Sequence, residues 1–213
     1  FDGAIDGSLK ALWIFAEDVV QTDPNTHHVV KAMQSLDLLV VQEIFMSETA
    51  KMADVVLPGT TFLEKSGTFT NTERRIQQVN AAVKPLPGTK TDGQIIVEMM
   101  RKLGFDQPDF DAAEVLKEVS SVVSFFEGVT WEGLGASPMG LQWPVNKKGE
   151  DTQILHIGEF KRGKGKFHYH DWKESEELTK HKNEYPFILT TSRELQHYNC
   201  ATMTRRTSNV QIL

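Results

Sequence analysis

ADVVLPGTTFLEKSGTFTNTERRIQQ, residues 53–78, is the stretch that decides the predicted fold. The apolar run 55–57 is typical of a short buried strand, and Pro58 and Gly59 end it. A long segment rich in hydroxyl side chains follows. In α/β proteins such a polar loop after a strand commonly forms part of a ligand site, and the alternative is a solvated loop followed by a hairpin.

Two further apolar runs, residues 12–15 and 38–41, precede this strand and have the same character. Between the first two runs, Asp23-Pro24-Asn25-Thr26 begins a predicted helix with apolar residues at helical spacing. Ser47 can cap a short helix over residues 48–52. Continuous apolar strands that alternate with helices predict an α/β fold, a Rossmann-like parallel sheet with flanking helices.

Polar residues follow each of the three predicted strands. In an open parallel sheet the ligand crevice lies beyond the carboxyl ends of the strands, so these residues should share one edge. Carboxylate and amide groups there can bind ribose hydroxyls or the N–H edge of a purine. No glycine-rich phosphate loop is present, which disfavours ordinary NAD binding. Taken singly, Asp18 and Glu43 are better explained as solvated carboxylates or helix caps, and it is their shared position that favours a ligand role. The residues concerned are Glu17, Asp18, Gln42, Glu43, Gly59 and Thr60.

Composition excludes several classes of site and partner. The 213 residues are 39% hydrophobic and carry a formal net charge of −6, which disfavours a nucleic-acid partner. A single cysteine, Cys200, excludes an internal disulfide framework and an all-cysteine metal site built from this chain alone. No apolar run approaches the roughly 20 residues that cross a bilayer. We expect a cytoplasmic protein, with the periplasm left open, and an internal fragment, because the chain starts without Met.

The second half of the chain contains further predicted elements. Thr91 or Asp92 begins a helix that ends at Gly104, and Asp111 begins another. Residues 152–172 predict a hairpin with a basic turn at 161–166. His168 and His170 have a spacing that zinc sites use, but a structural role is the favoured interpretation. A charged linker over 174–184 precedes a strand at 185–191.

The segment YPFILTTSRELQHYNCATMTRR, residues 185–206, places arginine, hydroxyl, histidine and amide side chains directly after that strand. Arginine offers bidentate donors and hydroxyls add neutral ones, so the segment suits a phosphate or pyrophosphate. A nucleophile and base pair formed by Cys200 and His197 is disfavoured, because no third orienting group is evident.

Both quoted stretches resemble one family, the molybdopterin-dinucleotide oxidoreductases. Residues 10–92 resemble the third domain of the large subunit of formate dehydrogenases that carry bis-molybdopterin guanine dinucleotide. Residues 185–206 resemble the start of their fourth, cofactor-capping domain, and the form TSRELQHY…MTRR favours formate dehydrogenase over nitrate reductase. The implied domains are a Rossmann-like dinucleotide-binding domain (1–145), a connector with a hairpin (146–184) and the truncated beginning of a β-barrel-like capping domain (185–213).

The resemblance implies two sets of cofactor contacts and no catalytic or metal-ligating residue in this chain. It implies a cofactor with Mo or W, a [4Fe-4S] cluster in a preceding part, and, as partners, the rest of the same subunit and electron-transfer subunits. Gly59 would contribute only its backbone N–H. The guanine dinucleotide contacts are Asp18, Thr22, Gln42, Gly59 or Thr60, and Asp92; the pterin or phosphate contacts are Arg193, Glu194, His197 and Tyr198.

The expected function is therefore the cofactor-binding part of an enzyme that oxidises formate to CO2 or runs the reverse reaction. Two alternatives stay open, namely a non-catalytic homologue like the large subunit of respiratory NADH dehydrogenases, and another molybdopterin oxidoreductase such as nitrate reductase. The polar residues later in the 53–78 stretch are expected to hold their loop together through carboxylate–arginine and hydroxyl–backbone bonds. They are Glu64, Thr68, Asn71, Glu73 and Arg74.

Overall fold

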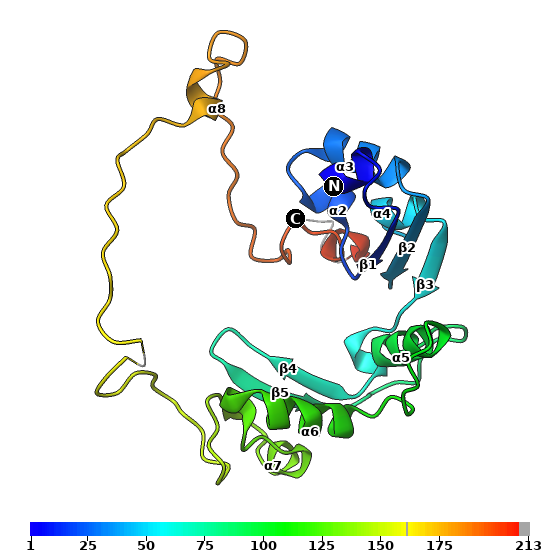
Figure 1. Cartoon of the computed structure of the whole chain (residues 1–213), viewed down its shortest axis with the longest axis vertical. Helices are drawn as coiled ribbons and strands as arrows, with labels where there is room; N and C mark the ends of the chain where they lie inside the picture. Colours follow the sequence, from blue (N-terminus) through cyan, green and yellow to red (C-terminus); the bar gives the residue numbers. More distant parts are fainter. Residues whose placement is uncertain (161, 209–213) are drawn as a thin grey trace. The chain divides into compact units, whose positions relative to one another are not determined.

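The computed structural model describes residues 1–160 and 162–208 (Figure 1). The chain divides into two compact units, Phe1–Gln153 and Ile154–Leu213. The first unit contains every strand of the described residues. The domain limits expected at residues 145 and 184 remain predictions.

A three-stranded parallel sheet forms the first half of unit 1 (Figure 1). Its strands are β1 (Ala11–Phe15), β2 (Leu38–Glu43) and β3 (Val55–Pro58), with β2 in the centre. The register pairs Phe15 with Gln42 and Glu43 with Pro58, so the three carboxyl ends meet at one edge. All three predicted strands and their parallel arrangement are confirmed.

Four short helices accompany this sheet, and the first turns of two of them are capped as the sequence indicates. The Asn25 side chain accepts from His28 N, and the Ser47 side chain accepts from Ala50 N. The core beneath them contains Val29 and Met33 together with the central strand. The helices are α1 (Asp2–Ile5), α2 (Val19–Thr22), α3 (Thr26–Gln34) and α4 (Glu48–Lys51).

A second, antiparallel sheet follows β3. The 3-10 turn η1 (Phe62–Glu64) leads into the hairpin of β4 (Gly67–Thr70) and β5 (Arg75–Val79), and β6 (Leu141–Gln142) pairs with β5. The Asn71 side chain accepts from the backbone N–H groups of Glu73 and Arg75 and thereby closes the hairpin turn. The 53–78 stretch is thus a strand, a polar loop and a hairpin in succession.

The helices at residues 112–122 and 131–135 pack against this second sheet and enclose a core of their own. Its buried members include Ile76, Leu116 and Leu134. A Cβ on Gly128 would lie 1.6 Å from the Asn146 carbonyl oxygen, so this crossing requires glycine. No helix within the described ranges is both long enough and apolar enough to cross a membrane. The helical elements are α5 (Asp92–Lys102), α6 (Ala112–Val122), η2 (Ser124–Phe126) and α7 (Trp131–Gly135).

Unit 2 departs from the prediction. Neither the hairpin expected over 152–172 nor the strand expected over 185–191 is present among its described residues, which form only α8 (Glu176–Thr179) and η3 (Thr204–Arg206). A hairpin needs a third strand or a packed face, yet Phe167 and Leu189 are fully or almost fully exposed. Lys161 of the expected basic turn, and residues 209–213 of the expected capping domain, lie outside the described residues.

Shortening a core side chain of β2 should destabilise unit 1 far more than shortening its neighbour. Leu39 is 1% exposed and Leu38 is 41% exposed, since successive strand residues face opposite sides. We expect Leu39→Ala to lower the free energy of unfolding by about 2–5 kcal/mol, because it leaves a cavity. Leu38→Ala should cost less than about 1 kcal/mol. Urea unfolding curves of both variants measure the difference, and equal shifts would contradict the assigned facing of β2.

Candidate functional site

The carboxyl ends of β1, β2 and β3 form a continuous edge, here called the rim and comprising residues 16–18, 42–43 and 59–60. Backbone hydrogen bonds fix it, because Ala16 N donates to Gln42 O (2.9 Å) and Gly59 N donates to Glu43 O (3.1 Å). The first turn of α5 joins the rim through Asp92. The parallel pairing therefore brings three separate segments together, and the hydrogen bond from Gln42 to Asp92 adds a fourth.

Asp18 lies at the start of α2 and is 4% exposed. Its Oδ1 accepts two hydrogen bonds from Thr49, from the backbone N at 3.0 Å and from Oγ1 at 2.7 Å. The Thr49 hydroxyl in turn accepts from Val20 N. The other carboxylate oxygen, Oδ2, is buried and has no hydrogen-bond partner. Asp18 thus uses one carboxylate oxygen for hydrogen bonds within the fold, and its other oxygen has no hydrogen-bond partner.

Gln42 shows the same division at the end of β2. It is 1% exposed, and its Nε2 donates to Asp92 Oδ1 at 2.9 Å. The other Asp92 oxygen is paired with the Lys65 ammonium. Gln42 Oε1 is buried without a partner. A Cβ on Gly59 would lie 3.2 Å from Asp92 Oδ1, so this glycine allows the carboxylate to approach the strand end closely.

Two threonines of the predicted site have different surroundings. Thr60 is buried and its Oγ1 has no partner. The Thr22 hydroxyl donates to Glu17 Oε1 (2.7 Å) at the surface. Thr60 therefore shares the uncommitted polar character of Asp18 and Gln42, whereas Thr22 does not.

The loop after the rim is held by side chains from the predicted set, with partners that differ in part. Glu64 caps η1 by accepting from the Thr61 backbone and hydroxyl, and it also accepts from Leu86 N. These hydrogen bonds lower the pKa of the Glu64 carboxyl, and the bond from the Thr61 backbone N–H has the largest effect. Arg74 donates to the backbone carbonyls of Trp143, Thr152 and Gln153, and not to a carboxylate as expected. Thr68 pairs with Gln78 in the hairpin register.

The four residues expected to contact pterin or phosphate belong to unit 2. His197 N donates to Glu194 O at 3.2 Å, and His197 Nδ1 lies 2.9 Å from Thr204 Oγ1. Tyr198 and Arg193 are exposed. The described contacts join His197 to its own segment.

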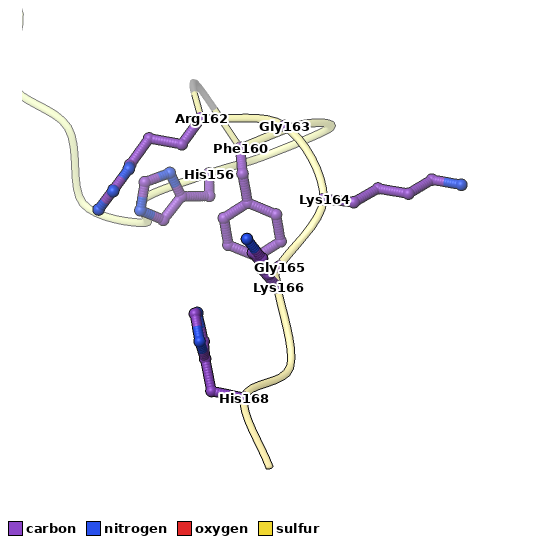
Figure 2. Close-up of a pocket in the computed structure, with 8 residues that line it drawn as sticks. All are labelled: His156, Phe160, Arg162, Gly163, Lys164, Gly165, Lys166 and His168. Carbon is purple, nitrogen blue, oxygen red and sulfur yellow. The ribbon is translucent and has the colours of Figure 1, made fainter.

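Unit 2 also contains a basic loop that borders an open cavity of about 520 Å³ (Figure 2). The ring centroids of His156 and Phe160 are 4.9 Å apart, and the loop curves around Phe160. Arg162, Lys164 and Lys166 line the same cavity. Across the described parts of the chain, no group of three or more His, Cys, Asp or Glu side chains could hold a metal ion.

Two residues at the rim are not predicted from the sequence. Thr49 lies on the helix that Ser47 caps, where a hydroxyl side chain has no distinguishing pattern. Lys65 follows Glu64 in the polar loop, and it meets Asp92 only because η1 and the start of α5 come together across 27 positions of sequence. Residue spacing carried no signal for either contact.

Removing the Thr49 hydroxyl should destabilise unit 1. Thr49→Val keeps the shape but leaves Asp18 Oδ1 and Val20 N each without one partner, which should lower the free energy of unfolding by about 1–3 kcal/mol. Thr22→Val, which breaks a surface bond, is the control and should change it by no more than about 0.5 kcal/mol. Chemical denaturation measures both, and equal effects would refute a buried role for Thr49.

The depressed pKa of Glu64 makes a signed prediction about acid stability. A carboxyl whose folded-state pKa lies below its unfolded value, about 4.3, stabilises the fold above that value and ceases to do so as the pH falls through the folded pKa. Glu64→Gln should therefore lose less stability than wild type between about pH 5 and pH 3. Unfolding midpoints across that range provide the measurement, and parallel profiles would show that Glu64 has no part in acid unfolding.

Comparison with known proteins identifies the family. Residues 2–102 match the model of the molybdopterin oxidoreductase family. The chain is 42% identical to the F420-dependent formate dehydrogenase subunit alpha of Methanocaldococcus jannaschii and 44% identical to the F420-dependent formate dehydrogenase 2 subunit alpha of Methanococcus maripaludis. Each alignment covers 95% of this chain and 30% of the relative, so the chain spans about a third of these relatives.

A putative formate dehydrogenase of Staphylococcus aureus is 36% identical over 99% of this chain and 21% of its own length. Among solved structures, acetylene hydratase from Pelobacter acetylenicus superimposes with a TM-score of 0.52 and 25% identity, covering 62% of this chain and 19% of that chain. Sequence and fold agree, and the chain belongs to the molybdopterin oxidoreductase family.

Proposed function

We propose that this chain is the guanine-dinucleotide-binding part of a molybdenum or tungsten formate dehydrogenase that interconverts formate and CO2. The names of the relatives at about 40% identity support formate as the substrate of the whole protein. The unpaired polar atoms of the rim support the binding of a nucleotide by this chain. Within the whole enzyme, this chain binds and orients the cofactor.

One observation carries the proposal. Asp18, Gln42 and Thr60, all expected as dinucleotide contacts, each bury a polar atom that has no partner. Such a group costs about 1–3 kcal/mol when left unsatisfied, so it is normally explained by a ligand or an ordered water. Three of them along one sheet edge fit a bound group rich in hydrogen-bonding atoms.

The chemistry of these atoms matches a guanine nucleoside. Guanine presents N1–H and an exocyclic amino group as adjacent donors, and ribose presents two hydroxyls. The Asp18 carboxylate and the Gln42 carbonyl oxygen accept such bonds, and the Thr60 hydroxyl can both donate and accept. Phosphates suit the rim less well, because Asp18, Glu43 and Asp92 are acidic. We assign pterin or phosphate contacts to Arg193, Glu194, His197 and Tyr198 of unit 2, and of these the acidic Glu194 suits the N–H donors of the pterin and not a phosphate.

The bound metal centre would supply the redox chemistry of formate, while residues of this chain bind the pterin dinucleotide. We place the metal ligand, the substrate-orienting groups and a [4Fe-4S] cluster in other parts of the polypeptide. Further electron-transfer subunits would carry electrons away from the cluster. A cytoplasmic location is part of the same proposal.

Another molybdopterin enzyme activity is the second candidate, and the likeness to acetylene hydratase is the observation that favours it. The formate dehydrogenase relatives weigh more, because they match at 42–44% identity over 95% of the chain, against 25% over 62% for that structure. A non-catalytic role is disfavoured because a chain that binds no cofactor gains nothing from unpaired buried polar atoms.

Guanine nucleotide binding at the rim is tested by titrating the intact, cofactor-free protein with GDP. Asp18→Asn preserves the size of the side chain and can still accept from Thr49, but it replaces Oδ2 with a donor. We expect the dissociation constant to rise by about tenfold or more, as for a lost hydrogen bond to a charged group.

Asp37→Asn is the matched control. Asp37 lies just before β2, at the opposite edge of the same sheet, where it forms a surface pair with Lys10. Its dissociation constant for GDP should equal that of wild type. If Asp18→Asn also bound GDP as tightly as wild type, the rim would not be the nucleotide site.

A further inference from the structure

We propose that Lys65, Asp92 and Gln42 act as one unit that fixes the orientation of the Gln42 amide and thereby selects a base with two adjacent N–H donors. Asp92 is the positioning residue of this unit, and Lys65 holds it. The inference rests on the proposed binding of a guanine nucleotide at the rim. It adds how the base is distinguished from adenine and which side chains enforce the choice.

The orientation of the Gln42 amide follows from the chemistry of its neighbour. An Asp carboxylate in an ion pair can only accept hydrogen bonds. Asp92 Oδ2 is paired with the Lys65 ammonium, and Oδ1 lies 2.9 Å from Gln42 Nε2. Turning the amide over would bring two oxygens together. Glutamine orientations are often ambiguous, but this one is determined by its partner.

The unit is enclosed, which strengthens its control of the amide. Gln42 is almost wholly buried, and the side chains of Lys65 and Asp92 are largely covered. Charge-assisted hydrogen bonds are stronger where water is excluded. Gly59 lies against the carboxylate, where a Cβ would be tight at 3.2 Å from Oδ1. The position of Asp92 therefore depends on a small residue at 59.

The consequence is that Gln42 offers a ligand only an acceptor, its Oε1. Gln42 Oε1 is buried and has no hydrogen-bond partner. A hydrogen bond from a base to this buried atom therefore forms in a site from which water is largely excluded. Guanine offers two adjacent donors on one edge, N1–H and the exocyclic amino group, which can meet both Gln42 Oε1 and the second unpaired acceptor of the rim, Asp18 Oδ2. The same edge of adenine has one donor, the amino group, beside an acceptor at N1, so adenine can satisfy only one of the two. Opposing acceptors in a closed site are penalised, and such sites discriminate strongly.

Asp92→Asn tests the inference by reversing the amide. Lys65 should hold the carbonyl oxygen of the new Asn, so its amino group faces Gln42. Gln42 must then turn to accept, and its Nε2 replaces Oε1 as the uncommitted atom. We expect the ratio of the ADP to the GDP dissociation constant, measured by calorimetry on the intact, cofactor-free protein, to fall by about tenfold or more.

A second variant separates this switch from general damage. In the Lys65→Met, Asp92→Asn double variant nothing holds the Asn oxygen outward, so the amide of residue 92 can turn and the preference for GDP should return in part. Asp54→Asn is the control, because Asp54 Oδ2 accepts from Leu39 N at the other end of the sheet. It should leave the ratio unchanged.

The outcomes distinguish this inference from the function it rests on. Loss of affinity for GDP and ADP by the same factor in Asp92→Asn, with no recovery in the double variant, would overturn the amide switch while leaving the nucleotide site in place. A wild-type protein that binds neither nucleotide would overturn the proposed function itself. A lowered ratio with recovery in the double variant supports both.

Discussion

The parallel pairing of β2 with both β1 and β3 is the constraint on which the rest of unit 1 depends. Parallel strands start at the same edge and end at the same edge, so residues far apart in sequence are delivered side by side without any direct attraction between them. Asp18, Gln42 and Thr60 owe their proximity to this pairing. The buried face of the central strand, Leu39 and Val41, provides the apolar contacts that keep the strands aligned.

The rim combines stability with readiness to bind. Asp18 and Gln42 each use one polar atom to tie segments of the protein together and leave the other unused. A side chain held in this way is already oriented, so a ligand does not have to restrict its rotation again on binding. The unpaired atoms are unfavourable for folding, and the committed bonds offset part of that cost.

Local sequence patterns predicted those parts of the fold that local physics decides. Three continuous apolar runs identified the strands, and Asn25, Ser47, Thr91 and Asp111 identified the helix starts, because a capping side chain bonds to its own first turn. The prediction of a hairpin at 152–172 was wrong, because a segment with alternating apolar and polar side chains forms a strand only where another strand or a core packs against it. The contact between Lys65 and Asp92 could not be predicted from the sequence, because it depends on the path of two separate loops.

Arg74 occupies a backbone conformation, with φ of +67°, that favours glycine. Glycine would ease that turn, yet it has no guanidinium to gather the carbonyls of Trp143, Thr152 and Gln153, which lie at the end of unit 1. Arginine at position 74 therefore provides hydrogen bonds to distant carbonyls, although its backbone conformation is locally unfavourable. Over evolutionary time this position should resist exchange even for lysine, whereas the Arg74 contacts place no such constraint on residues beyond 153, which they do not reach.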